Sequence, residues 1–334
     1  MIKTLLLDRV LQAMLAIVVL LLIFDAQQAA SSSLATLTSL IQMLPYFALA
    51  IAIAAYANAS SADTLIARAF SGNPRRTVVM AAMVGAISPF CSCGVIPLIA
   101  AMLGAGVPLA PVMAFWIASP IMDPEMFILT SAGIGFNFAI AKTLAAIAMG
   151  LFSGFAVLGL QKYGWLANPL QAGIAGGCSS SCAPTAEVKW KFWQERQRVQ
   201  KFNAEATKIG IFLGKWLTLA FLLESLMLAY VSSDWIVAYV GSENPFAIPL
   251  AAIVGAPSYL NGYAAIPLIS GLLEIGMTPG AAMAFITAGA VSSVPAAIAV
   301  FALVKKPVFV LYLLLGLSGA MLSGWVYQLS GGVI

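Results

Sequence analysis

The sequence has no histidine and few charged residues, and both scarcities restrict what the protein can be. Charged residues make up 8% of the 334 positions and apolar residues 62%, and the mean hydropathy is +0.99. A soluble domain needs about a quarter of its residues charged, so this class is excluded. We predict an all-α polytopic membrane protein, because long apolar runs suit helices better than the alternating pattern of a barrel.

Other absences exclude further classes of function. Without histidine, the chain lacks the usual proton carrier near neutral pH, so any proton relay must use carboxylates or lysine. No G-x-x-x-x-G-K-[ST] loop occurs, so the chain does not power itself with ATP. The net charge of +4 is attributed to cytoplasmic loops. We expect no enzymatic activity, cofactor or nucleic-acid partner; the expected partners are the lipid bilayer and a small-molecule or soft-metal substrate, in an oligomer of unknown size.

The sequence contains an internal repeat. Residues 84–118 recur without a gap at residues 254–288, so that a shift of 170 places Ile96-Pro97-Leu98-Ile99 on Ile266-Pro267-Leu268-Ile269 and Gly106 on Gly276. An apolar chain that carries the same Gly/Pro-broken segment twice is typical of a transporter built from two structural repeats. In such proteins the interrupted segments indicate the substrate site.

Apolar runs predict the membrane-spanning segments. Spans are expected at residues 8–25, 34–57, 107–122, 126–158 (bent near 133–137), 208–231, 279–303 and 307–329, with broken segments at 77–104 and 246–273. Proline and glycine should interrupt the helix within 88–94 and again within 257–262.

The distribution of charge predicts the topology. Basic residues around Lys3, Arg75, Lys162 and Lys305 are assigned to the cytoplasm. An even number of crossings is then required between Arg75 and Lys162, which holds if the broken segments are re-entrant hairpins. Two full crossings with a misleading charge bias are the alternative. With hairpins, the halves form two inverted repeats plus one N-terminal helix.

This topology divides the chain into four parts. Residues 1–30 are predicted to be a retained signal-anchor helix, because there is no soluble domain to export; a signal sequence cleaved near residues 26–30 is the alternative. Residues 34–159 and 208–334 are the two transmembrane repeats, and residues 160–207 are a cytoplasmic linker. Residues 186–201 mix three aromatic residues with five basic ones, which predicts an amphipathic helix in the headgroup region, or otherwise a solvated charged linker.

The motif Pro89-Phe90-Cys91-Ser92-Cys93-Gly94 carries the most specific chemistry. Irregular backbone at membrane depth is tolerated only where it lies against protein or lines a cavity. Thiolates favour Cu(I), Zn(II) or trivalent arsenic, and a curled loop can turn both cysteines toward one ligand. We therefore predict that Pro89, Cys91, Ser92, Cys93 and Gly94 bind substrate, with Cys91 and Cys93 as metal ligands. The alternative is that both cysteines only pack.

The second repeat replaces this chemistry. Asn261 aligns with Cys91 and Tyr263 with Cys93, and Tyr259 lies close by. An asymmetric substrate site is expected, with sulfur on one side and an amide and phenols on the other. The alternatives are a turn role for the asparagine and packing for the tyrosines.

Ionisable residues within predicted spans are candidates for coupling transport to an ion. Glu224 is a possible proton carrier, or the partner of a lysine; Lys142 is a possible counter-ion, or extends toward the membrane surface. Asp123 lies in an outer turn, where it contributes to an exit vestibule or is only solvated. Cys178 and Cys182, in the linker, are an incomplete zinc site or reduced thiols in a flexible segment.

The stretch SPFCSCGVIPLIAAMLGAGVPLAPVMAFWIASPIMDPEMF, with its echo in the second half, resembles the predicted-permease family that contains the organoarsenical efflux permeases. The features shared are PFCSCGVIPL, the turn with Ser119, Pro120 and Pro124, and the later AAIPLI. The resemblance implies a multi-pass protein of the bacterial inner membrane and places the family's cysteine motif at Cys91 and Cys93.

The combined prediction is a secondary transporter, with its N-terminus and linker in the cytoplasm, that exports a trivalent organoarsenical by alternating access around the two cysteines. A soft-metal ion, Cu(I) or Zn(II), or a sulfur-containing anion is the alternative substrate. A membrane thiol-redox enzyme and a non-transporting assembly factor are the rival classes.

Overall fold

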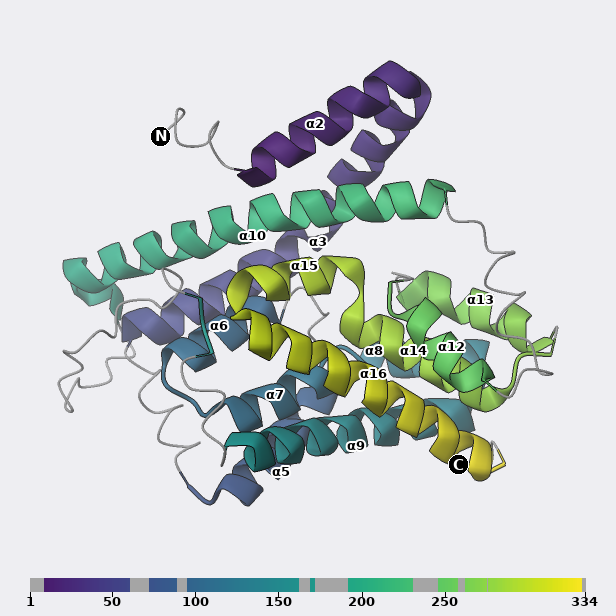
Figure 1. Cartoon of the computed structure of the whole chain (residues 1–334). Helices are drawn as coiled ribbons and strands as arrows, with labels where there is room; N and C mark the ends of the chain where they lie inside the picture. The colour runs from purple at the N-terminus through teal and green to yellow at the C-terminus, as the bar shows by residue number, and fades with distance from the viewer. Residues whose placement is uncertain are drawn as a thin grey trace.

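The computed structural model describes residues 9–60, 72–88, 95–161, 169–171, 192–230, 246–257, 262–274 and 276–331. Within them the chain is helical, and β-structure is limited to isolated bridges (Figure 1). The helices are α2 (Arg9–Phe24), α3 (Ala26–Ser60), α5 (Pro74–Ile87), α6 (Ile96–Gly104), α7 (Leu109–Ala118), α8 (Pro124–Gly133), α9 (Phe136–Gln161), η1 (Phe192–Gln194), α10 (Arg196–Tyr230), α12 (Ala247–Gly255), α13 (Gly262–Glu274), α14 (Pro279–Ser292), α15 (Val294–Leu303) and α16 (Lys306–Leu329). The predicted all-α class is confirmed.

Two helices in the described part of the chain are long and apolar enough to cross a membrane. These are α9, with 26 residues, and α16, with 24, and about 20 are needed. The pair α14 and α15 makes a third candidate, bent by 43°. A membrane protein follows from these helices together with the apolar composition.

The first two helices join through a single residue. The Asp25 amide donates to the Leu21 carbonyl at 2.7 Å, and the Asp25 carboxylate accepts from the Gln28 amide at 2.9 Å. Asp25 therefore ends α2 and caps α3. Helix α3 starts before the predicted residue 34 and continues through Pro45 for 35 residues.

The same close helix contact occurs once in each half of the chain. A Cβ added to Gly85 would lie 2.8 Å from the Phe115 carbonyl oxygen, where α5 crosses α7. A Cβ added to Gly255 would lie 2.5 Å from the Phe285 carbonyl oxygen, where α12 crosses α14. Both residues of the second contact are 170 positions after those of the first. Only glycine permits this approach, which is the way small residues bring membrane helices together.

A second pair of contacts repeats at the same offset. Gly154 of α9 faces the Ala114 side chain of α7, with 2.8 Å between an added Cβ and the Ala114 Cβ. Gly324 of α16 faces Ala284 of α14 in the same way, at 2.9 Å. Helices α5, α7 and α9 thus pack together as α12, α14 and α16 do.

The turn that follows α6 in the first half recurs after α13 in the second half. Gly106 has φ of 83° and Gly276 has φ of 102°, a left-handed conformation that favours glycine. The residue after each glycine donates to a carbonyl five positions earlier: Val107 to Met102 at 3.0 Å, and Met277 to Leu272 at 2.8 Å. The pairing of Gly106 with Gly276 in the sequence therefore marks the same helix-ending turn.

Contacts between the halves are reciprocal. Helix α8 packs on α13 as α15 packs on α6, and α7 contacts α16 as α14 contacts α9. Two pairs of equivalent helices, α9 with α16 and α3 with α10, pack on each other directly. Figure 1 shows α10 on the same side of the bundle as α2 and α3, away from α5 and α9.

Further predicted elements differ from the structure. The span predicted at 107–122 contains α7, which has 10 residues and is shorter than a membrane crossing needs. Residues 279–303 are not one unbroken helix, because the chain leaves the helical conformation at Ser293 and Pro295 follows in the first turn of α15. The described part of the predicted interfacial helix, residues 192–201, is η1 followed by the start of α10, which continues unbroken to Tyr230. The predicted bend near residues 133–137 is confirmed by the junction of α8 and α9.

A short piece of the linker binds to the second half. The Lys305 amide donates to the Pro169 carbonyl at 2.9 Å, and the Gln171 amide donates to the Leu303 carbonyl at 3.1 Å. The Gln171 side chain also donates to the carbonyls of Phe301 and Val304. The linker and Lys305, which we assigned to one side of the membrane, are thus in direct contact.

Candidate functional site

Most residues of the predicted substrate site lie outside the described residues. These are Pro89, Cys91, Ser92, Cys93, Gly94, Tyr259 and Asn261. Tyr263 is in the first turn of α13 and Glu224 is in α10, but their side chains also lie outside the described part.

The structure does describe the residues immediately before and after the cysteine motif. Helix α5 ends at Ile87, and Ser88, which is buried, donates its amide to the Gly85 carbonyl at 3.0 Å. After the motif, Val95 and Ile96 are fully buried at the start of α6. The motif therefore starts and ends inside the packed protein. Irregular backbone is tolerated at such a place within a membrane protein.

The Ser88 hydroxyl has a further property. It is buried and has no hydrogen-bond partner within the described residues. A buried polar atom without a partner costs free energy, so it is expected to find one in a neighbouring group, water or a ligand. Ser88 immediately precedes Pro89, at the edge of the predicted site.

A second polar region lies where α7 stops and α8 begins. Asp123 precedes α8, and its carboxylate accepts from the Met126 amide at 2.8 Å. Lys142 of α9 is 3% exposed, and the Asp123 carboxylate acts on its ammonium group electrostatically. Two of the three predicted coupling residues are thus close enough to interact electrostatically. A buried lysine on which a carboxylate acts inside a membrane bundle is a functional-site candidate.

The equivalent region of the second half has different chemistry. Tyr312 takes the place of Lys142, 170 positions later, and its hydroxyl donates to the Val291 carbonyl. Ser293 takes the place of Asp123, and its buried hydroxyl has no partner within the described residues. The charged pair of the first half is replaced by two neutral side chains.

Tyr312 also links the two halves. Its ring lies 5.0 Å, centroid to centroid, from the ring of Trp116 in α7. Both side chains are almost completely buried. Neither residue was selected from the sequence, where an isolated aromatic in an apolar helix carries no signal. The shift of 170 that pairs Lys142 with Tyr312 could have identified the position.

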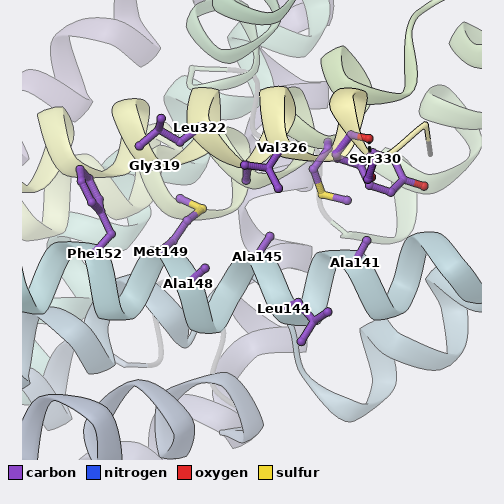
Figure 2. Close-up of a pocket in the computed structure, with 13 residues that line it drawn as sticks. Ala141, Leu144, Ala145, Ala148, Met149, Phe152, Gly319, Leu322, Val326 and Ser330 are labelled. Atoms are coloured by element: carbon purple, nitrogen blue, oxygen red, sulfur yellow. Dashed lines mark hydrogen bonds between the residues drawn. The ribbon is translucent and has the colours of Figure 1, made fainter. Parts of the chain in front are cut away.

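A groove of about 270 Å³ runs between α9 and α16. Figure 2 shows Phe152 and Gly319 toward one end and Ala141 and Ser330 toward the other, so the two helices run in opposite directions. Nine of the thirteen lining residues are alanine, leucine, methionine, phenylalanine or valine, and Met149 packs against Gly319. The groove offers apolar contact rather than ligands for a metal.

These features define a helical membrane protein of two halves with matching helix contacts, each with interrupted helices. Residues 28–329 match the family described as predicted permeases, and the chain belongs to that family. Membership supports a role as a transporter within the membrane rather than as an enzyme.

Two relatives are similar to this chain in sequence. The chain is 20% identical to UPF0718 protein MJ0584 of Methanocaldococcus jannaschii over 293 residues, covering 74% of this chain and 80% of that protein. It is 26% identical to UPF0718 protein YcgR of Bacillus subtilis over 110 residues, covering 33% of this chain and 37% of that protein. No solved structure matches this chain.

Proposed function

We propose that this permease exports a thiophilic substrate, a trivalent organoarsenical, with Cys91 and Cys93 as its ligands. A substrate R–As(OH)₂ reacts with two thiols to form two As–S bonds and releases two water molecules; hydrolysis reverses the step and frees the substrate. The supporting observation is the place of the motif: both of its flanks, at Ser88 and Val95, are buried in the helix bundle. Thiolate sulfur is a soft ligand and favours thiophilic centres such as trivalent arsenic.

The proposed mechanism is alternating access by two inverted repeats. Helices α9 and α16 are equivalent at the offset of 170, and they run in opposite directions along their shared groove (Figure 2). Equivalent helices run in opposite directions when the two halves enter the bilayer from opposite sides. Residues 34–159 and 208–334 would then exchange conformations around a central site, as in other transporters with broken helices.

Coupling to a proton is assigned to the carboxylates and the buried lysine. The Asp123 carboxylate acts electrostatically on the buried ammonium group of Lys142, and proton transfer between the two groups would remove both charges. Glu224, within α10, is the second candidate carrier. We place the N-terminus and the 160–207 linker in the cytoplasm of a bacterial cell, with the permease in its inner membrane.

Transport into everted membrane vesicles tests the proposed substrate. Vesicles containing the wild type should accumulate methylarsonous acid, and the Cys91→Ser/Cys93→Ser variant should not. The matched control is Cys178→Ser/Cys182→Ser, which removes the other two thiols of the chain and should transport normally.

The same vesicles separate the competing substrates. Accumulation of Cu(I) or Zn(II), but not of the arsenical, would assign the site to a soft metal. Full arsenical transport by the Cys91→Ser/Cys93→Ser variant would disprove the thiol-ligand mechanism.

A further inference from the structure

The two halves differ at the residue that precedes the helix after α7 in the first half and after α14 in the second. Asp123 precedes α8 and Ser293 precedes α15, 170 positions apart. The Asp123 carboxylate accepts from the Met126 amide at 2.8 Å. Ser293 makes no corresponding hydrogen bond to α15. Its hydroxyl is 0% exposed and has no partner within the described residues.

The second interruption also lacks the charges of the first. Tyr312 stands at the position of Lys142, and its hydroxyl is used by the Val291 carbonyl. The Ser293 hydroxyl and the amides of Val294 and Ala296 remain as donors, because Pro295 has no N–H and the Ala297 amide donates to the Ser293 carbonyl. The Ser293 side chain supplies these two amides with no acceptor. A helix N-terminus carries roughly half a positive charge, which attracts an anion.

We infer that the N-terminal end of α15 binds a small oxyanion or carboxylate, at the place that the first half fills with the Asp123 carboxylate. One oxygen of the ligand accepts from the Ser293 hydroxyl and from the Ala296 amide, which is the equivalent of the Met126 amide. Neutral donors suffice for this ligand, because the helix end supplies the positive potential. The site uses no thiol, so it is a second ligand site and does not depend on the proposed arsenical.

Equilibrium binding of radiolabelled inorganic phosphate to the purified full-length protein in detergent tests the site. The ionic strength is held constant with chloride, and unlabelled acetate and sulfate serve as competitors. The wild type should show saturable binding of one phosphate per chain. Ser293→Ala should bind about tenfold more weakly, because one hydrogen bond to a charged ligand is lost.

The Ser293→Asp variant provides the sharpest comparison. Its carboxylate reproduces the arrangement at Asp123, caps α15 and repels an anion, so saturable binding should disappear. If this variant does not elute as a monodisperse protein, Ser293→Asn replaces it, because a neutral side-chain oxygen at the same place also fills the site.

The matched control is Ser318→Ala. The Ser318 hydroxyl donates to the Leu314 carbonyl of its own helix, so phosphate affinity should not change. The inference is overturned if the wild type shows no saturable binding, or if the variant with Asp or Asn at residue 293 binds like the wild type. Since the assay measures no transport, either result leaves the thiol-site proposal to its own test.

Discussion

Replacing Gly154 by alanine tests the repeated helix packing most directly. Gly154 lies where α9 crosses α7 and α5, and an added Cβ would be 2.6 Å from the Val78 Cγ1 and 2.8 Å from the Ala114 Cβ. Ordinary van der Waals contact begins at 3.4 Å. The alanine Cβ cannot turn away, so α9 must move from its neighbours by several tenths of an ångström.

The magnitude follows from two opposing effects. Overpacking of a close contact costs about 1–3 kcal/mol. Alanine in place of glycine stabilises a helix interior by up to ~1 kcal/mol. Gly159, in the same helix, has nothing within 4 Å of an added Cβ, so Gly159→Ala has only the second effect. The difference between the two variants isolates the packing cost, and we expect about 1–3 kcal/mol.

Equilibrium unfolding in mixed micelles with increasing SDS, followed by circular dichroism, measures this difference. Gly324→Ala is the repeat-equivalent substitution, with an added Cβ 2.9 Å from the Ala284 Cβ. It should destabilise to a similar extent. The reasoning fails if Gly154→Ala is as stable as Gly159→Ala, or if the substitutions at Gly154 and Gly324 act in opposite directions.

Three further predictions concern polar contacts. Tyr312→Phe leaves the Val291 carbonyl without its donor and should lower the free energy of unfolding by about 1 kcal/mol in the same SDS titration; an unchanged midpoint would contradict the hydrogen bond. Lys142→Met should destabilise more than the double variant Lys142→Met/Asp123→Asn, because the single change leaves one charge unpaired; equal unfolding midpoints would show that the pair is not coupled. Gln328→Leu removes the acceptor of an α14 amide and should cost about 1 kcal/mol, detected as a lower thermal midpoint in detergent, whereas an unchanged midpoint would show that this bond adds nothing.

The offset of 170 and the helix interruptions were predictable from the sequence because both depend on residue types with strict local requirements. Gly106 and Gly276 adopt a left-handed turn, and Gly85 and Gly255 allow carbonyls to approach. A shift of the sequence against itself pairs such residues, because no other residue type fits these places.

The polar contacts at the junction of α14 and α15 were not predictable in this way. Lys142 and Tyr312, like Asp123 and Ser293, occupy equivalent positions with different chemistry. A search for identical residues does not select them, although the shift of 170 aligns their positions. The continuous α10 was also missed: hydropathy marks the apolar part of a helix, whereas the polar residues from Arg196 onward extend it beyond that part. The positions of the cysteines relative to other groups stay a prediction.

The contact of residues 169–171 with the junction of α15 and α16 bears on how the chain is assembled. Four hydrogen bonds, two of them from the Gln171 side chain, hold the end of the first half to the second. The two halves should then stay associated even if the peptide chain between them is cut. Genes encoding residues 1–175 and 176–334 as separate chains should yield a complex that copurifies when both are expressed together.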